Sequence, residues 1–159
     1  MGAFVTLHSY PSGKLRGCVG IPYPVYPLWM AVVSSAISSA FKDPRFPPLR
    51  EEDLKIIVIE LSILTPPEEV PSDDLPRGVE VGKHGIIVDS GGIKGLLLPQ
   101  VAEKYGWSSI EFLENTCLKA GLDRNCWKRE DTKVYTFQAL IFEEAEPWGK
   151  ILRISSESR

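Results

Sequence analysis

The stretch KIIVIELSIL, residues 55–64, is the strongest β-strand signal in the sequence. Successive side chains of a strand point to opposite faces, so the odd-numbered residues from Ile57 to Ile63 give one uniformly apolar face. Glu60 and Ser62 interrupt the other face. A carboxylate is costly to bury without a partner, so we expect the second face to border a cleft. The alternative is that Glu60 is exposed to solvent on an edge strand.

Turn residues on either side of this strand indicate two β-hairpins. The first joins residues 3–10 to residues 15–21 through Pro-Ser-Gly-Lys at 11–14. The second joins residues 79–88 to residues 93–98 through Asp-Ser-Gly-Gly at 89–92. Proline, glycine, serine and aspartate favour turns, and the flanking runs are rich in strand-forming residues.

Two helices and a last strand complete the expected elements. Apolar spacing predicts a helix over 28–41, which ends before Asp43-Pro44 because a residue preceding proline avoids the helical region. We expect the serines of this helix to lie close to other groups. Ser108 and Glu111 form a capping-box pattern that opens a second helix, closed by Gly121. Its expected core stripe is Ile110, Leu113, Cys117 and Ala120.

Residues 134–142 return to strand, so strands do not alternate regularly with helices. This order favours an α+β fold of mainly antiparallel sheet over a doubly wound parallel sheet. A length of 159 residues suits a single domain. Four prolines and an acidic bias make residues 65–76 the expected boundary between two lobes.

The composition excludes several classes of protein. The chain has 18 basic and 21 acidic residues and a net charge of -3, which argues against a nucleic-acid partner. No apolar run is long enough to span a bilayer, and no signal peptide opens the chain. Three cysteines without C-x-x-C spacing fit a reducing, cytoplasmic compartment better than a disulfide framework. With only His8 and His84 as histidines, we expect no metal site, and we consider His8 incidental.

The motif LRGCVG, residues 15–20, is the strongest candidate for a site. In a regular strand Arg16 and Cys18 share one face, and a guanidinium beside a sulfur favours the thiolate. Gly17 and Gly20 lack side chains, so a ligand or another backbone can approach them closely. Cys18 is therefore a candidate nucleophile. The alternative is a small apolar residue in a tightly packed strand.

His84 is the candidate acid/base, because Gly82 and Gly85 let its imidazole project from an irregular strand. The alternative is a histidine satisfied by a backbone carbonyl. Lys42, Asp43 and Arg45 are candidates for binding an anionic substrate. For these three we favour a structural role, in which Asp43 ends the helix and Arg45 pairs with it. Cys117 and Cys126 are expected to be core residues.

Several of these segments resemble the AMMECR family. The resemblance lies in ordered blocks over about residues 2–142: GAFVTL (2–7), LRGCVG (15–20), KDPRFPP (42–48), LSILT (61–65), GKHGI (82–86), LLPQVA (97–102) and TCLKAG (116–121). It implies an α+β fold with a smaller lobe at roughly 72–107, a larger lobe from the remainder, and the cysteine motif near their junction. It also implies an additional N-terminal helical segment, whereas this sequence starts at its first expected strand; either the chain is naturally short or that helix is absent from this sequence.

The resemblance implies no settled activity, and it associates the family with Memo-like and radical SAM proteins. Our first hypothesis is a cleft enzyme that modifies a small molecule or macromolecule by group transfer. Cys18 is its nucleophile, His84 and Glu60 are its other catalytic candidates, and Arg16 steadies the thiolate or an anion. The second is a noncatalytic binding or regulatory module that acts with a Memo-like or radical SAM protein through Tyr23, Tyr26 and Trp29. No phosphate-binding glycine motif is present, and the sequence identifies no cofactor.

Overall fold

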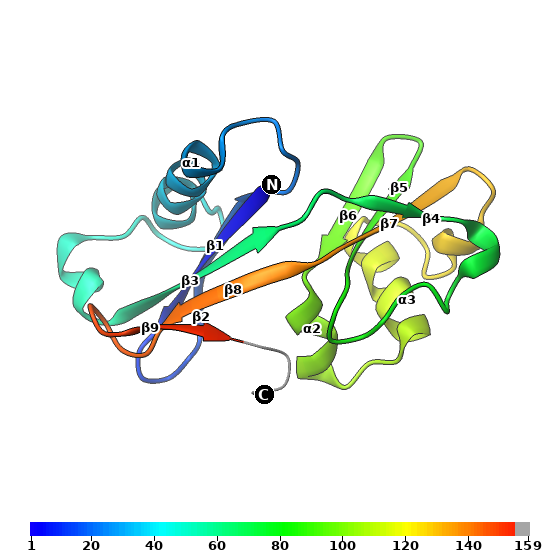
Figure 1. Cartoon of the computed structure of the whole chain (residues 1–159). Helices are drawn as coiled ribbons and strands as arrows, with labels where there is room; N and C mark the ends of the chain where they lie inside the picture. The colour runs from blue at the N-terminus through cyan, green and yellow to red at the C-terminus, as the bar shows by residue number, and fades with distance from the viewer. Residues whose placement is uncertain (155–159) are drawn as a thin grey trace. The chain divides into compact units, whose positions relative to one another are not determined.

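The computed structural model describes residues 1–154, which divide into two compact units (Figure 1). Unit 1 comprises Met1–Pro66 and the chain from Leu140 onward, and unit 2 is Pro67–Ala139. Unit 2 contains more residues than the segment 72–107 expected for a smaller lobe. The helix and strand that follow residue 107 contact the strands of this unit and so belong to it. The two antiparallel sheets with separate helices confirm the α+β class.

Unit 1 is built on a five-stranded sheet in the order β2-β1-β3-β8-β9. Its strands are β1 (Gly2–Ser9), β2 (Leu15–Ile21), β3 (Ile57–Leu64), β8 (Ala139–Glu144) and β9 (Ile151–Ile154). The predicted hairpin is confirmed as β1 and β2, and β1 also pairs antiparallel with β3. The strand predicted from KIIVIELSIL is therefore the middle strand of the sheet, with a neighbour on each side.

Helix α1 (Leu28–Phe41) packs on one face of this sheet, against β1 and β2 (Figure 1). Its buried residues are small, namely Ala31, Ser35 and Ser39. The hydroxyl of Ser35 donates to the carbonyl of Ala3, and that of Ser39 donates to the carbonyl of Val5 at 2.6 Å. The prediction that the helix serines lie close to other groups is confirmed for Ser35 and Ser39, whereas Ser34 is exposed. Small side chains bring this helix near the strands.

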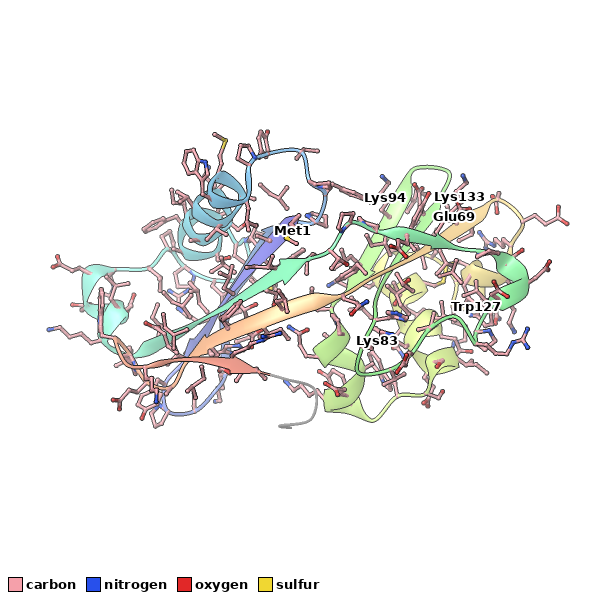
Figure 2. All side chains as sticks on the ribbon, viewed as in Figure 1. Met1, Glu69, Lys83, Lys94, Trp127 and Lys133 are labelled. Carbon is pink, nitrogen blue, oxygen red and sulfur yellow. A yellow bond between two sulfur atoms is a disulfide. The ribbon has the colours of Figure 1, made fainter. Side chains whose placement is uncertain are left out.

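Unit 2 has a four-stranded sheet in the order β4-β7-β5-β6. Its strands are β4 (Glu68–Val70), β5 (Gly85–Ser90), β6 (Ile93–Leu97) and β7 (Thr132–Phe137), and its α-helices are α2 (Pro99–Tyr105) and α3 (Ser109–Lys119). Short 3-10 helices occupy Glu51–Lys55 in unit 1 and Ser72–Asp74 and Cys126–Lys128 in unit 2. An ion pair of 3.7 Å joins Lys133 on β7 to Glu69 on β4 (Figure 2).

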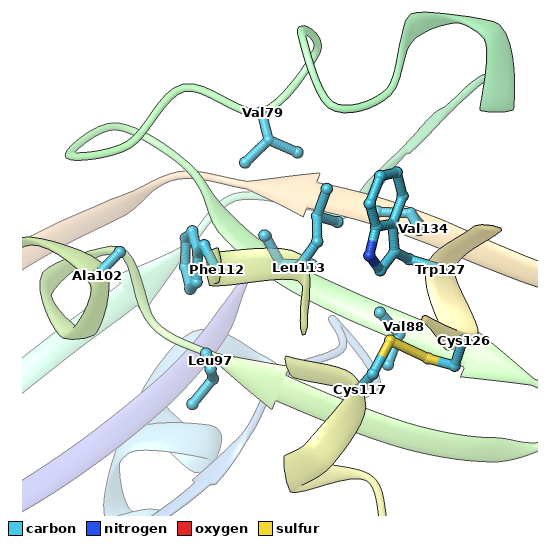
Figure 3. Packing of buried hydrophobic residues seen from close by; sticks show 11 residues of the cluster. Val79, Val88, Leu97, Ala102, Phe112, Leu113, Cys117, Cys126, Trp127 and Val134 are labelled. Atoms are coloured by element: carbon cyan, nitrogen blue, oxygen red, sulfur yellow. A yellow bond between two sulfur atoms is a disulfide. The ribbon is translucent and has the colours of Figure 1, made fainter. Parts of the chain in front are cut away.

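The core of unit 2 lies between its sheet and its helices (Figure 3). It contains Val88, Phe112, Leu113 and Val134, all almost fully buried. Cys117 and Cys126 are core residues, as predicted, but they also form a disulfide bond (Figure 3). The expectation that the cysteines form no disulfide framework is therefore wrong for this pair. Their nine-residue separation showed no disulfide pattern, and the turn after α3 brings them together.

Other predicted elements differ in extent from those observed. A turn occupies residues 81–83 and the residues beside it are irregular, so the second hairpin begins only at Gly85. The run 134–142 is interrupted at Gln138, so β7 belongs to the sheet of unit 2 and β8 to that of unit 1. The capping box of Ser108 and Glu111 is confirmed at the start of α3. Ile110 is exposed rather than part of the core stripe.

Across residues 1–154, none of the helices combines the length and the apolar character needed to cross a bilayer.

Candidate functional site

The sheet of unit 1 has one face toward α1 and an opposite face that carries polar groups. Val5 and Leu7 belong to the apolar cluster that includes residues of α1. Thr6 and His8 alternate with them and therefore lie on the opposite face. Thr6 is directly opposite Cys18 on β2 and Glu60 on β3. We call Cys18, Thr6, Glu60 and His8 the polar face; it brings two of the predicted site residues, Cys18 and Glu60, into one row.

Cys18 is partly exposed at the end of this row. The hydroxyl of Thr6 donates a hydrogen bond to Cys18 Sγ over 3.4 Å. All three cysteines of the sequence lie within residues 1–154, and Cys18 is the free one, since the other two are joined to each other. A reagent that modifies thiols therefore has a single target in the oxidised protein.

The loop after α1 holds the outer edge of β2 at Cys18. The amide of Cys18 donates to Asp43 Oδ2 at 2.9 Å, and Arg45 Nη2 donates to the carbonyl of Cys18 at 3.3 Å. Arg45 also pairs with Asp43 at 2.7 Å, which confirms the pairing expected from the sequence. An edge strand otherwise presents unpaired backbone groups. Asp43 and Arg45 satisfy those of Cys18.

The Asp43 carboxylate and the Arg45 guanidinium shift each other's pKa values. Hydrogen bonds from the Arg45 side chain, and then from the backbone amides of Cys18 and Arg45, hold the pKa of the Asp43 carboxyl far below its usual range, although burial opposes the shift. The hydrogen bond with Asp43 is the main cause that raises the pKa of Arg45, although burial opposes the shift. Arg45 is therefore a cation held beside the backbone of Cys18.

Arg16 occupies a different position from the one expected. Leu7 pairs with Gly17 and His8 pairs with Leu15, so the register skips Arg16, and a β-bulge breaks the alternation on which the prediction rested. Arg16 Nη2 donates to the carbonyl of Pro47 at 2.8 Å. Its guanidinium also lies 5.9 Å from the centre of the Phe46 ring. These contacts attach the bulge to the loop after α1.

The two glycines of the motif allow close packing within unit 1. A Cβ on Gly17 would collide with the carbonyl oxygen of Ser39 in α1, and a Cβ on Gly20 would collide with the ring of Phe4. The close approach predicted for Gly17 is therefore that of another backbone. Lys42 is exposed at the C-terminal end of α1.

His8 and Glu60 form a pair that the sequence analysis missed. His8 Nε2 lies 3.7 Å from Glu60 Oε2, and the Glu60 side chain is only 8% exposed. The hydrogen bond with Glu60 is the main cause that raises the pKa of His8, with further contributions from the charges of Glu60 and Glu143. The three residues help to line a pocket of about 460 Å³. Glu60 is thus buried on a central strand, not exposed on an edge.

His84 lies in unit 2, and its described contacts belong to that unit. The amide of Glu80 donates to His84 Nδ1 at 3.1 Å. Burial is the main cause that lowers the pKa of His84. A second pocket of about 600 Å³ is lined by His84 together with Glu68, Asp74 and Arg77.

Thr6, His8 and Glu143 were not predicted as site residues, although the sequence indicates part of their arrangement. Thr6 and His8 alternate with Val5 and Leu7, so a period of two places them on one face. Their alignment with Cys18 and Glu60 depends on the register between strands, which the sequence alone does not give. Glu143 joins the group only because β8 lies beside β3 across a large sequence separation.

Comparisons with known proteins agree on one family. The family model described as AMMECR1 matches residues 1–142. A protein of Aquifex aeolicus is 54% identical over 157 residues, covering 98% of this chain and 80% of that protein. Protein PH0010 of Pyrococcus horikoshii is 53% identical over 158 residues, covering 96% of this chain and 77% of its own. The chain is also similar to the crystal structure of the uncharacterized protein PH0010 from Pyrococcus horikoshii, with a TM-score of 0.93 and 52% sequence identity. The match covers 98% of this chain and 79% of that chain.

Proposed function

The chain belongs to the AMMECR1 family, and because the names of the relatives reported above state no activity, we propose from the site itself that it is a group-transfer enzyme with Cys18 as its nucleophile. The observation that carries this proposal is the hydrogen bond from the Thr6 hydroxyl to Cys18 Sγ. This hydroxyl lies where it can donate to the sulfur as it reacts, and the thiolate is the nucleophilic form of cysteine.

Two further features support this assignment. Arg45 contacts the Cys18 carbonyl, so a cation lies beside the reacting residue. The amide and the carbonyl of Cys18 are both bonded to the loop after α1, which fixes the backbone that carries the sulfur. A nucleophile held in one position reacts with less loss of freedom than a mobile one.

The reaction class is a two-step transfer through a thioester. Cys18 Sγ attacks the acyl carbon of a donor R–CO–X; the S–C bond forms, the C–X bond breaks, and X leaves with the thiol proton. An acceptor Y–H then attacks the thioester; the C–Y bond forms, the S–C bond breaks, and the proton of Y–H returns to the sulfur. The sum is R–CO–X plus Y–H giving R–CO–Y plus X–H, with no oxidant or reductant.

An activated acyl ester tests this proposal. We expect 4-nitrophenyl acetate to release one equivalent of 4-nitrophenolate rapidly and to leave an acetyl group on Cys18, detected by intact mass spectrometry and peptide mapping. Cys18→Ser should abolish both signals. Thr6→Val should slow acetylation, whereas Thr65→Val, a matched change in unit 1 far along the chain, should not. Acetylation of lysines only, with Cys18 unmodified, would refute the proposal.

A binding or regulatory module is the second candidate, and the outer surface of α1 favours it. Tyr26, Trp29, Val33 and Ile37 are large, apolar or aromatic, and about half or more exposed. Exposed apolar clusters of this kind mark protein-binding surfaces. The family resemblance suggests a Memo-like or radical SAM partner. Capture of such a partner that Trp29→Ala abolishes and Cys18→Ser leaves unchanged would support a module; capture unaffected by either change would exclude this surface.

We further propose a cytoplasmic location. The free thiol of Cys18 supports it, because a reducing compartment preserves such a group. Cys117 and Cys126 are fully buried, so their disulfide is shielded from soluble reductants. Cell fractionation with an antibody to the protein tests this location; recovery in the secreted fraction would contradict it.

A further inference from the structure

We propose that His8, Glu60 and Glu143 bind a single divalent transition-metal ion. Each residue offers one ligand atom, and these three atoms all lie within 4.8 Å of one another. The residues come from β1, β3 and β8, so the sheet fixes their backbones. This assignment goes beyond the proposed group transfer and does not depend on it.

The donor set indicates the class of ion. One imidazole nitrogen and two carboxylate oxygens suit Zn²⁺, Mn²⁺ or Fe²⁺. Ca²⁺ and Mg²⁺ prefer ligand sets made only of oxygen, and Cu⁺ prefers sulfur. We therefore expect a first-row divalent ion, with Zn²⁺ as the simplest probe because it has no redox chemistry of its own.

The distances require only small side-chain movements. Ligands at tetrahedral angles around Zn²⁺ stand about 3.4 Å apart when each bond is about 2.1 Å long. His8 Nε2 and Glu60 Oε2 are already 3.7 Å apart. Since these three residues also line the pocket of about 460 Å³, a water or substrate atom has space to complete the coordination. Three protein ligands and an open position are typical of a catalytic rather than a structural metal site.

The surroundings of His8 resemble those of a metal-binding histidine. A backbone hydrogen bond joins the imidazole to Gly13. Metal-bound histidines commonly make such a bond with the nitrogen that does not bind the metal, and it orients the ring. His8 Nε2 lies 3.7 Å from Glu60 Oε2, on the side of the other two ligands.

Zinc titration of untagged, metal-free protein tests the site, with isothermal calorimetry for affinity and thermal unfolding as a second readout. We expect one equivalent of Zn²⁺ to bind and to raise the melting temperature. His8→Gln and Glu143→Gln should weaken binding on the order of 100-fold. His84→Gln and Glu146→Gln, which remove the other histidine and a nearby exposed carboxylate, should bind like wild type.

Cys18→Ser is the necessary further control, because a free thiol also binds Zn²⁺. The proposal requires that Cys18→Ser retain one equivalent of Zn²⁺ at unchanged affinity. Each variant is first shown to be folded by circular dichroism without metal. Binding that is lost in Cys18→Ser, or that folded His8→Gln and Glu143→Gln both retain at wild-type affinity, would overturn the proposal. So would the absence of Zn²⁺ binding in wild type.

Discussion

Among single residues, Cys18 and His8 have the neighbours that matter most for the proposed chemistry. Thr6 donates to the sulfur of Cys18 on one side, and Glu60 lies opposite Thr6 on the other. His8 adjoins Glu60. A hydroxyl, a thiol, a carboxylate and an imidazole thus share a face whose reverse is packed against a helix.

The two histidines provide a direct residue-scale prediction. The neighbouring carboxylates raise the pKa of His8 and burial lowers that of His84, so the midpoints lie on opposite sides of 6.5. An NMR pH titration follows the two imidazole signals, which are assigned with His84→Gln, and gives both midpoints. A single midpoint shared by the two rings, or the reverse order, would contradict the geometry.

The same shifts predict how stability changes with pH. The raised pKa of His8 stabilises the fold at pH values below its unfolded value of about 6.5, and this contribution is lost as pH rises through the folded pKa. The lowered pKa of His84 acts in the opposite sense: its contribution is present above about 6.5 and is lost as pH falls through the folded pKa. Urea unfolding at pH values from 5 to 8 gives the free energy of unfolding and so measures both contributions. His8→Gln should remove only the loss at higher pH; an unaltered profile in His8→Gln would count against the pair with Glu60.

Asp43 is the residue on which the Cys18 loop most depends. It is 5% exposed and accepts from the amides of Cys18 and Arg45 as well as from the Arg45 side chain. Asp43→Asn should lower the free energy of unfolding at pH 7 by about 2 kcal/mol, because hydrogen bonds to a charged group are replaced by neutral ones. The exposed Asp131→Asn is the control, and its free energy of unfolding should change little.

The lowered pKa of Asp43 also means that its contribution to stability is lost progressively as pH falls below about 4. Equal stability of the two variants would show that the loop does not need this carboxylate.

At the scale of elements, the contact between α1 and β2 decides the shape of the site. Gly17 lies against the carbonyl of Ser39, and Ser39 also bridges the backbones of Val5 and Val19. The helix can therefore approach the sheet only where side chains are absent or small.

Gly17→Ala tests this contact. The added methyl group meets helix backbone, which cannot rotate away, so we expect a loss of about 3 kcal/mol in the free energy of unfolding. Gly91→Ala is the comparison: its backbone has a φ of 61°, but nothing lies near the added atom, and the expected loss is about 1 kcal/mol. Chemical denaturation of both variants gives the two values. A loss in Gly17→Ala no greater than in Gly91→Ala would argue against close packing of α1.

The elements also show what the sequence could predict. The hairpin of residues 3–21, the helix 28–41 and the strand of KIIVIELSIL follow from turn residues and apolar spacing, and each is confirmed. The inner face of α1 does not follow its apolar spacing: Val33 and Ile37 are exposed, and Ser35 and Ser39 are buried. Apolar spacing identifies a helix, but it does not show that serine hydroxyls can satisfy strand carbonyls and so occupy the inner face.

At the scale of the whole molecule, two units with separate sheets are joined by a chain that crosses between them twice. Residues 134–142 illustrate the limit of sequence analysis: they read as one strand, yet the residues on either side of Gln138 belong to different sheets. The same limit applies to the candidate site. Cys18 and Glu60 were predicted one at a time, whereas Thr6, His8 and Glu143 are recognised only when strand order and register are known.

The disulfide gives a prediction for unit 2. Chain entropy for a loop of about ten residues gives a stabilisation of about 2.5 kcal/mol. Cys117→Ala/Cys126→Ala should therefore unfold at lower denaturant, and hydrogen exchange should accelerate in α3 and β7 but not in β1 or β3. Faster exchange throughout both units would contradict independent behaviour of the two units.

Reaction of Cys18 with iodoacetamide at pH 7 measures the nucleophilicity of this one sulfur, because the other two cysteines are joined in a disulfide. Intact mass spectrometry over time gives the rate of single-adduct formation. We predict that Cys18 is alkylated faster than free cysteine and that Arg45→Gln slows the reaction several-fold more than Arg16→Gln does. A sulfur that stays unmodified in the folded protein, or that reacts no faster than free cysteine whether or not Arg45 is present, would rule out Cys18 as an activated nucleophile.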